Sequence, residues 1–501
     1  MMIDFKPGYF VLLFLCACMA FAGCKDPWKD HTEINIERLD RTLFEQISND
    51  ANLSTFTSYV VKTGYDAVLR SSKSFTVWAP GNEALKSIDA TIVNDTAALK
   101  RFVGNYIANQ SYFTTSPKPS LVIRMLNGKN TIFTKTTFEE ANISQADIYV
   151  KNGVLHTINA ASVPKANAWE FLQSLGTASL QKDFIKSQEQ EEVDTSRGVL
   201  LYKDPVTTKG VYQEGTTFKV IRNRYFQRIA NISSEDSLIT YIILNNTAFT
   251  AEKNKLATYN KHPNALYADT LTNWSVVKDL VVNKVYGINE LPDSMTTVTG
   301  VKIHLDKSAI VETRLLSNGI AYVVNGIGYK LMENKIPTVI IQGEMPDSLR
   351  VPANPLARIK NDPQGRHFTD LQTGSITSSP SPLYFYRYKS TVNSVKYEVY
   401  WRAVNDILVA PISMKVDFNT NKSFGSALFP LATVGYHTVP SIIGLLQDSD
   451  AYRDAYKEVY LGTYTADAYG TLYTFLASSL AASSTAPTAL SLDYIKLKPV
   501  N

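Results

Sequence analysis

Apolar residues recur along the chain at spacings that predict both helices and strands. Ile36–Ile47 and Leu99–Ile107 repeat apolar positions at intervals of three and four residues, which predicts an amphipathic helix in each segment. Between them, Phe75–Pro80 alternates as a strand does. Pro80 is expected to end its ladder because proline has no N–H to donate. The first part of the chain therefore mixes helices with strands.

Two short motifs follow these elements. Asn82 comes directly after the strand and is expected to cap the helix that Glu83 starts. Further on, Asn152 and Gly153 form a strong turn signal that leads into another alternating strand. Each motif places a turn residue at the end of a predicted strand.

These two blocks, Phe75–Leu85 (FTVWAPGNEAL) and Asn152–Pro164 (NGVLHTINAASVP), resemble the two signatures of the fasciclin domain. The resemblance implies one α+β domain over residues 34–165. Tyr106 is followed by Ile107, where that family often has a Tyr-His pair associated with adhesion. The residues carrying the signature have a structural role in this interpretation, and His156 is expected to be packed and hydrogen-bonded: Phe75, Pro80, Asn82, Glu83, Asn152, Gly153 and His156.

The pattern then repeats, with less similarity. Ser317–Gly326 copies Lys151–Ala160, and Asn318-Gly319 again opens a strand. Leu238–Phe249 matches the first signature in shape but lacks its Ala-Pro. Ala168–Leu175 and Trp274–Val282 are predicted as the opening and middle helices. We expect a second, divergent fasciclin-like domain over residues 167–332.

The remaining third of the chain has a different pattern. Pro-rich sequence at Pro346–Leu356 marks a boundary, and short strand candidates separated by turn residues follow it. They are Lys396–Ala403, Met414–Phe418, Glu458–Thr465, Thr471–Leu476 and Ser491–Val500. This spacing predicts an all-β jelly-roll-like sandwich over residues 340–501. The ending Leu492–Val500 resembles the last strand of jelly-roll carbohydrate-binding modules.

Aromatic residues cluster in this part of the chain. Tyr384, Tyr386 and Tyr388 share one face of a predicted strand, and Trp401 lies a short distance further on. An exposed row of such rings would stack on sugars, so these four residues are the candidate glycan-binding positions. The alternative is that the row forms the core of the sandwich.

The amino-terminal segment predicts export. Tyr9–Met19 is almost unbroken apolar sequence behind Lys6, and it is shorter than the roughly 20 residues that a spanning helix needs. Ala22-Gly23-Cys24 resembles the lipobox of bacterial lipoproteins, which implies a signal peptide over 1–23 and lipid attachment at Cys24. An ordinary secretory signal is the alternative. A polar tether over 24–33 follows, and its acidic residues resemble a surface-export signal; the periplasmic face is the alternative to the cell exterior.

Composition narrows the possible chemistry. All three cysteines lie within the first 24 residues, which excludes disulfides and cysteine-bound zinc from the body of the chain. The net charge of +4 shows no basic tract, so a nucleic acid is not an expected partner. No catalytic motif is present, the six histidines are far apart, and no metal or cofactor is expected. Asn361–Gly365 is interpreted as a turn, with a Ca²⁺ site as the alternative.

The favoured hypothesis is a non-enzymatic, lipid-anchored outer-membrane protein that binds a glycan or another protein and serves in adhesion. The domain layout resembles fasciclin lipoproteins of Bacteroides-like bacteria. A second hypothesis is an accessory glycan-binding subunit of an outer-membrane uptake complex of the starch-utilisation type, with a transporter as partner. A third is a hydrolase whose active site is assembled from distant residues of the last domain.

Overall fold

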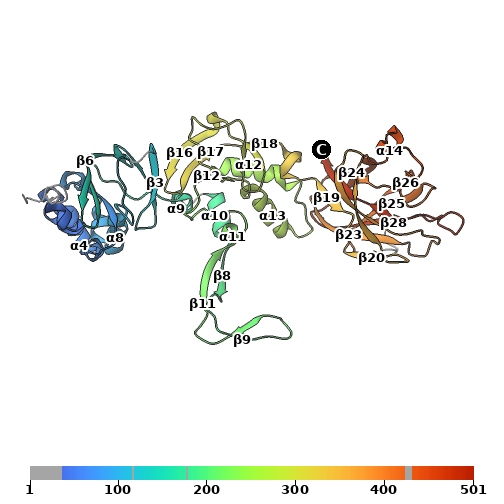
Figure 1. Cartoon of the computed structure of the whole chain (residues 1–501), viewed down its shortest axis with the longest axis horizontal. Helices are drawn as coiled ribbons and strands as arrows, with labels where there is room; N and C mark the ends of the chain where they lie inside the picture. Colours follow the sequence, from blue (N-terminus) through green and yellow to red (C-terminus); the bar gives the residue numbers. More distant parts are fainter. Residues whose placement is uncertain (1–36, 116–117, 177–178, 424–431, 501) are drawn as a thin grey trace, which may run out of the picture. The chain divides into compact units, whose positions relative to one another are not determined.

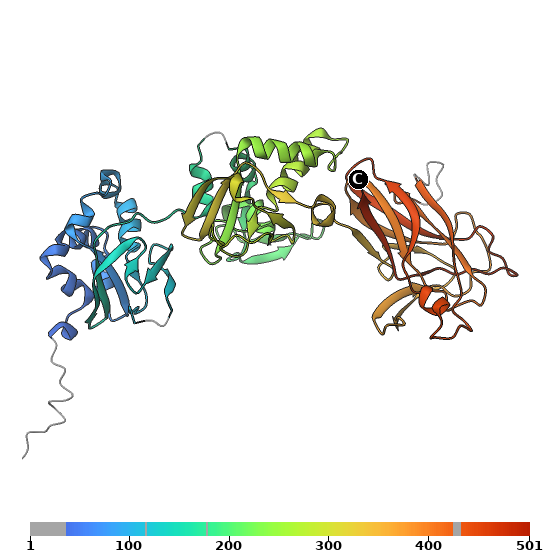
Figure 2. The same ribbon diagram turned by 90° about the horizontal axis from the view of Figure 1, so that it is seen from above.

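The computed structural model describes residues 37–115, 118–176, 179–423 and 432–500 (Figure 1; Figure 2). The chain divides into two compact units, Met1–Lys165 and Ala166–Asn501. Cys24, the predicted signal peptide at 1–23 and the tether at 24–33 lie outside the described residues. Within the described ranges, no helix combines the length and the apolar character that crossing a bilayer requires.

The first unit is a fasciclin-like α+β fold. Its helices are η1 (Glu37–Asp40), α3 (Leu43–Ser48), η2 (Ala51–Leu53), α4 (Ser54–Lys62), α5 (Tyr65–Leu69), α6 (Asn82–Leu85), α7 (Ala90–Asn94) and α8 (Thr96–Gly104). Its strands are β1 (Phe75–Pro80), β2 (Ile107–Ala108), β3 (Ser120–Arg124), β4 (Asn130–Thr134), β5 (Thr137–Phe138), β6 (Ala141–Val150) and β7 (Gly153–Ile158). They form one sheet in the order β2-β1-β7-β6-β5-β4-β3, in which β1 and β7 are parallel.

The single helix expected over Ile36–Ile47 is instead two short helices. η1 ends at Asp40, and Thr42 then caps α3, because its side chain accepts from the Glu45 N–H and Glu45 accepts from the Thr42 N–H. This reciprocal cap fixes where α3 begins. Leu43, Phe44 and Ile47 of α3 remain buried in the domain core, as the apolar spacing predicted.

The side chain of Asn152 holds the parallel strands in place. Its Oδ1 accepts from Leu43 N at 2.8 Å, and its Nδ2 donates to the carbonyls of Leu69 at 2.8 Å and Ser71 at 2.7 Å. Gly153 then lies directly opposite Phe75. A Cβ atom at Gly153 would lie 1.9 Å from the Phe75 carbonyl oxygen, and φ is +150°, so only glycine fits here.

The first half of the second unit contains the same arrangement. Its helices are α9 (Ala168–Ser174), α10 (Leu180–Lys186), α11 (Arg224–Arg228), α12 (Asn246–Ala257), α13 (Ala265–Val277), η3 (Lys307–Ala309) and η4 (Leu331–Lys335). Strands β12 (Ile239–Leu244), β13 (Val281–Val282), β16 (Ile310–Leu316) and β17 (Gly319–Val324) form a sheet in the order β13-β12-β17-β16, with β12 and β17 parallel. Strands β14 (Met295–Thr296), β15 (Lys302–His304) and β18 (Gly328–Tyr329) form a small second sheet.

Asn318 and Gly319 repeat the hydrogen bonds and the close approach of the first signature. Asn318 Oδ1 accepts from Ala168 N at 2.9 Å, and Nδ2 donates to Ile232 O at 3.0 Å and Ser234 O at 2.9 Å. A Cβ atom at Gly319 would lie 1.9 Å from the carbonyl oxygen of the residue opposite, Ile239. The second unit thus begins with a domain that repeats the sheet arrangement and the Asn-Gly contacts of the first, and we refer to it as the second fasciclin-like domain.

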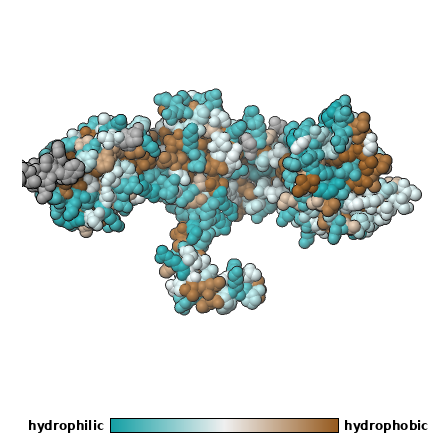
Figure 3. Space-filling model, viewed as in Figure 1, coloured by the Kyte–Doolittle hydropathy of each residue, from teal (hydrophilic) through white to brown (hydrophobic). Residues whose placement is uncertain are grey.

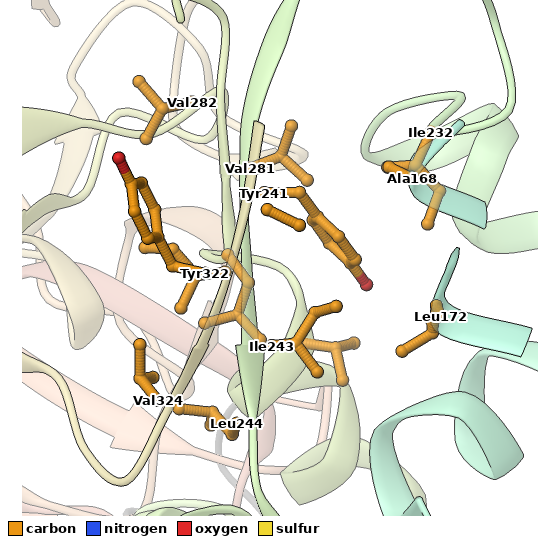
Figure 4. Close-up of a cluster of buried hydrophobic side chains, with 14 of the residues drawn as sticks. Ala168, Leu172, Ile232, Tyr241, Ile243, Leu244, Val281, Val282, Tyr322 and Val324 are labelled. Carbon is orange, nitrogen blue, oxygen red and sulfur yellow. The ribbon is translucent and has the colours of Figure 1, made fainter. Parts of the chain in front are cut away.

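The core of this second fasciclin-like domain lies on both sides of its sheet. Tyr241 and Tyr322 point to opposite faces, and Leu172 from α9 lies on the Tyr241 side (Figure 4). The middle helix differs from the prediction of Trp274–Val282. It runs from Ala265 to Val277, because Val281 and Val282 pair with β12 as strand β13.

An inserted arm interrupts this domain between α10 and α11. It consists of β8 (Glu189–Asp194), β9 (Leu200–Lys203), β10 (Gly210–Tyr212) and β11 (Phe218–Asn223). β8 pairs with β11 and β9 with β10, both antiparallel. The arm extends away from the helices that carry it (Figure 1).

The second half of this unit is a β-sandwich, which confirms the predicted all-β region. Its strands are β19 (Val339–Gln342), β20 (Ser348–Arg350), β21 (Leu356–Asn361), β22 (His367–Gln372), β23 (Phe385–Val392), β24 (Lys396–Arg402), β25 (Ile412–Asn419), β26 (Ala432–Val439), β27 (Val459–Thr465), β28 (Gly470–Ser478), β29 (Ser491–Leu492) and β30 (Tyr494–Val500), with one helix, α14 (Asp450–Asp454). Two sheets, β19-β30-β24-β27 and β20-β23-β28-β25-β26, enclose the core, and β21-β22-β29 forms a third.

Hydrogen bonds join the two halves of the second unit. Ser394 Oγ donates to Thr258 O at 2.9 Å and accepts from Lys261 N at 3.0 Å. The adjoining segment is anchored by a buried ion pair, in which Lys335 Nζ lies 3.0 Å from Asp279 Oδ2. The next residue, Ile336, packs in the sandwich core.

Candidate functional site

The signature residues of the first fasciclin-like domain serve its fold. Asn82 does not cap α6 as predicted, because it is the first residue of that helix and Gly81 occupies the N-cap position. Its Oδ1 accepts from Thr55 N at 2.9 Å and its Nδ2 donates to Ala51 O at 2.9 Å, so it caps α4 from a distance. Glu83 pairs with Lys86 on the exposed surface.

The remaining two residues of the first block lie in β1, where Phe75 is buried. Pro80 is the last residue of that strand, as expected.

His156 is a packed core residue and has no exposed surface. Its ring stacks on Trp78 with centroids 5.6 Å apart, and Nε2 lies 3.0 Å from the Tyr112 carbonyl oxygen. Burial lowers the pKa of His156, against opposing effects of the Tyr112 carbonyl and Asp147. In the second domain, Tyr322 takes its place and donates to Tyr286 O at 2.7 Å. This position therefore stabilises the fold in both domains.

The predicted row of glycan-stacking rings is not exposed. Tyr386, Tyr388 and Trp401 are at most 1% exposed and belong to the core between the two sheets, and Tyr384 packs against the same core partly buried. The Tyr388 hydroxyl donates to Gly343 O at 2.9 Å. Tyr386 and Tyr388 face inward from β23 and Trp401 faces inward from β24, so the rings meet in the core between the two sheets. The rings therefore lie in the core of the sandwich, which is the alternative that the sequence analysis left open.

A different set of tyrosines lies on the outer face of the other sheet. Tyr400 on β24 is directly opposite Tyr460 on β27 and Lys496 on β30. The Tyr400 and Tyr460 rings are 5.3 Å apart between centroids, and Tyr460 is 51% exposed. Lys496 Nζ lies 4.5 Å from the Tyr400 centroid. We call this group, together with the adjacent Tyr494, the tyrosine face.

A polar hollow of about 470 Å³ adjoins the tyrosine face, and Tyr494 and Glu458 belong to its lining. The Tyr494 hydroxyl donates to Glu458 Oε2 at 3.0 Å. Burial and this hydrogen bond raise the pKa of Tyr494 to about 12, so its hydroxyl stays protonated at neutral pH. Charged side chains of both signs line the rest of the hollow: Asp362, Arg366, Arg402, Asp450, Arg453, Asp454 and Lys457.

Most of these charges are paired with one another. Arg453 pairs with Asp450 at 2.7 Å and Lys457 with Asp454 at 2.7 Å. Burial acts to raise the pKa of Asp362, but hydrogen bonds from Arg366 and Gln364 outweigh it, and the pKa is lowered. The hollow is therefore lined by donors and acceptors with little net charge.

Arg402 belongs to the lining of the hollow and lies between two carboxylates. It approaches Asp362 at 3.4 Å and Asp493 at 3.3 Å, and its guanidinium lies 4.5 Å from the Phe368 ring. Its Nε is buried and makes no hydrogen bond to the described residues. Burial raises the pKa of Asp493 to about 6 despite Arg402.

A buried ion-pair network lies on the neighbouring strands. Arg358 and Lys360 of β21 both contact Asp370 at 2.6 Å, and both contact Asp406. Because Asp370 is buried, removal of both cations would leave its charge uncompensated. The network joins β21 to β22 beside Asp362, which follows β21 directly.

An apolar hollow of about 400 Å³ lies on the other side of α14. Trp401, Val439, Leu445 and Ala455 are among its lining residues, and Asp454 lines both hollows. Trp401 thus belongs to the sandwich core and also borders this hollow. The two hollows and the tyrosine face together form the candidate site.

The described residues contain no cluster of His, Cys, Asp or Glu that would hold a metal ion. Asp362, in the segment considered for Ca²⁺, accepts from Gln364 N and from Arg366 N, each at 2.9 Å. Its carboxylate therefore closes a turn, as the turn interpretation of Asn361–Gly365 expected.

The alternation of residues along β24 did not lead to a prediction of the tyrosine face, although it contains a signal for it. On β24, Tyr397, Val399 and Trp401 alternate with Glu398, Tyr400 and Arg402, and only the first set is uniformly apolar or aromatic. The mixed polar set therefore marks the outer face. The pairing of Tyr400 with Tyr460 depends on strand order, which one sequence does not reveal.

The family comparison identifies one domain directly. Residues 51–164 match the fasciclin domain family. No curated protein matches the chain in sequence.

Several solved structures resemble parts of the chain. A FAS1 domain pair from the insect cell adhesion molecule Fasciclin I is 13% identical, with 57% of this chain and 99% of that chain covered and a TM-score of 0.22. A family 35 carbohydrate binding module from Clostridium thermocellum is 14% identical over 32% of this chain and 98% of that one, with a TM-score of 0.18. The C-terminal CBM6 of LamC from Zobellia galactanivorans is 11% identical over 32% and 98%, with a TM-score of 0.17. Scores this low assign no function.

Proposed function

We propose that this chain is a non-enzymatic binding protein whose C-terminal sandwich binds a glycan on the tyrosine face and in the polar hollow. The observation that carries the proposal is the contact of the half-buried Tyr400 with the exposed Tyr460, beside a hollow lined with both carboxylates and guanidinium groups. Flat rings cover the C–H faces of sugars, and charged groups form strong hydrogen bonds with hydroxyls.

The charge balance of the hollow favours an uncharged glycan. Its cations are largely compensated by neighbouring carboxylates, as in the Arg453–Asp450 and Lys457–Asp454 pairs. An anionic sugar would meet these carboxylates, whereas hydroxyl groups use acceptors and donors alike.

The fasciclin-like domains act as the scaffold in this proposal. Their signature residues are engaged in folding, as with the Asn152 and Asn318 hydrogen bonds. Lipid attached at Cys24 would tether them to the outer membrane and present the sandwich for adhesion. Cys24→Ala should release the protein from the envelope fraction; a variant that still sediments with envelopes would refute the anchor.

A glycan array probed with the purified full chain tests the binding proposal. The expected result is selective binding of neutral glycans that is lost in the Tyr400→Ala/Tyr460→Ala variant. Tyr436→Ala is the matched control, because Tyr436 is 39% exposed on the other sheet. Binding that survives in the double variant would refute the site. New reducing ends from a bound polysaccharide would instead show a hydrolase.

A further inference from the structure

The arm of the second fasciclin-like domain has no counterpart in the first. α10 corresponds to α4, because Leu180 N donates to Asn246 Oδ1 as Thr55 N donates to Asn82 Oδ1. In the first domain, only Thr63 and Gly64 separate α4 from α5. The fold thus closes without an arm, and the inserted residues serve something other than the core.

The arm exposes apolar side chains on a ribbon that has no core of its own. Val193 is 59% exposed, Phe218 58% and Ile221 74%. Hydrophobic surface is visible on the arm in Figure 3. Within the described part of the chain, β8 and β11 pair only with each other, so each has a free edge. A two-stranded ribbon is marginally stable in water, and free edges recruit further strands.

The two edges carry opposite charges. β8 (EQEEVD) contains four carboxylates and no base, whereas β11 (FKVIRN) contains two bases and no acid. Inside the ribbon, Lys219 pairs with Glu191 at 2.6 Å, and Arg222 lies 3.6 Å from Glu192. Both bases of β11 are exposed, and none of the four acids of β8 is fully buried, so these charges can also meet those of a strand added at an outer edge.

We propose that the arm joins copies of this chain edge to edge, with β8 of one copy pairing with β11 of the next. Like strands cannot meet this way, since β8 against β8 would set carboxylates opposite one another. Pairing β8 with β11 places acids beside bases and lets the exposed Val193 and Ile221 contact apolar neighbours. This interface uses two different surfaces, so copies associate head to tail, as a ring or as an open chain.

Self-association of this kind is independent of glycan binding, and it would multiply any weak surface interaction through avidity. Light scattering and sedimentation of the purified full chain test it. The average mass is expected to rise with concentration beyond a dimer, and the association is expected to weaken at high salt.

Charge reversal provides the sharpest variants. Glu191→Lys/Glu192→Lys leaves β8 with two acids and two bases, so its net negative charge is lost, and Lys219→Glu/Arg222→Glu makes both edges acidic. Each variant alone is expected to associate about tenfold more weakly or not at all, a loss of about 1.4 kcal/mol. Mixing the two variants is expected to restore association as a mixed complex.

A variant with a shortened arm tests whether misfolding, rather than a lost interface, explains the loss of association. Residues 191–221 are replaced by Asn-Gly, which joins Gln190 to Arg222, a directly opposed pair, through a two-residue hairpin turn. This variant is expected to be monomeric, to keep its melting temperature and to bind glycan as before. A wild type that stays monomeric, a closed dimer, or a shortened variant that associates normally would each overturn the proposal.

Discussion

On β24, Tyr400 and Trp401 are neighbours in sequence but lie on opposite faces of the strand. Trp401 is 1% exposed and packs with Tyr386 and Tyr388 in the sandwich core. Tyr400 faces outward, against Lys496 and the exposed Tyr460. The side of the strand, rather than the density of aromatic residues, therefore decides whether a ring stabilises the fold or is available to a ligand.

The largest expected effect on stability comes from truncating one of the buried rings of the sandwich core. Trp401→Ala removes a fully buried ring, and we expect it to lower the free energy of unfolding of the sandwich by about 3–5 kcal/mol. Urea unfolding of the full chain, followed through the sandwich transition, measures this loss. A cost below about 1 kcal/mol would contradict the assignment of Trp401 to the core.

Truncating the rings of the tyrosine face should affect glycan binding and leave the stability of the sandwich nearly unchanged. Tyr400→Ala and Tyr460→Ala are expected to change the unfolding free energy by less than about 1 kcal/mol, since surface substitutions cost little. Each is expected to weaken glycan binding by about tenfold or more, as loss of an aromatic anchor does. Titration calorimetry with the best array ligand measures the binding, with Tyr436→Ala as control.

The stability of the sandwich is expected to fall as the pH rises, because of Asp493. The folded pKa of Asp493 is raised from 3.8 to about 6 by burial, so this group stabilises the fold at low pH. Its contribution is lost as the pH rises through about 6, and we expect an effect of about 1 kcal/mol because solvent screens part of it. Thermal melting across this range should show the trend, and Asp493→Asn should flatten it.

The smallest effect is expected in the first fasciclin-like domain, where a buried ring also titrates. Burial lowers the pKa of His156 below 6.5, so the domain loses stability as the pH falls through that value. Acidification should therefore weaken this domain while the Asp493 contribution strengthens the sandwich. Thermal melting of the His156→Phe variant should show a flatter acid limb; an unchanged limb would assign the acid sensitivity elsewhere.

Sequence reasoning predicted most of the fold because its signals are local. Asn152-Gly153 and Asn318-Gly319 mark positions where a side-chain amide and a missing Cβ are both required, and these requirements appear directly in the residue types. The strand candidates of the sandwich also agree closely with β24, β27 and β28, since each alternates regularly.

The site and the arm depend on information that one sequence does not contain. Tyr386 and Tyr400 both lie on alternating aromatic strands, and only the packing of the two sheets distinguishes inside from outside. The polar stretch Lys186–Arg197 contains β8, which packs against no core and so lacks the apolar alternation that predicts a strand.

The most direct test of this account is tyrosine footprinting of the full chain with and without a bound glycan. Tyr400 and Tyr460 should be modified in the free protein and protected by the glycan, whereas the buried Tyr386 and Tyr388 should remain unmodified in both states. The exposed Tyr202 on the arm serves as an internal control whose modification should not change. Glycan binding without protection of Tyr400 and Tyr460 would contradict the central claim that the tyrosine face holds the ligand.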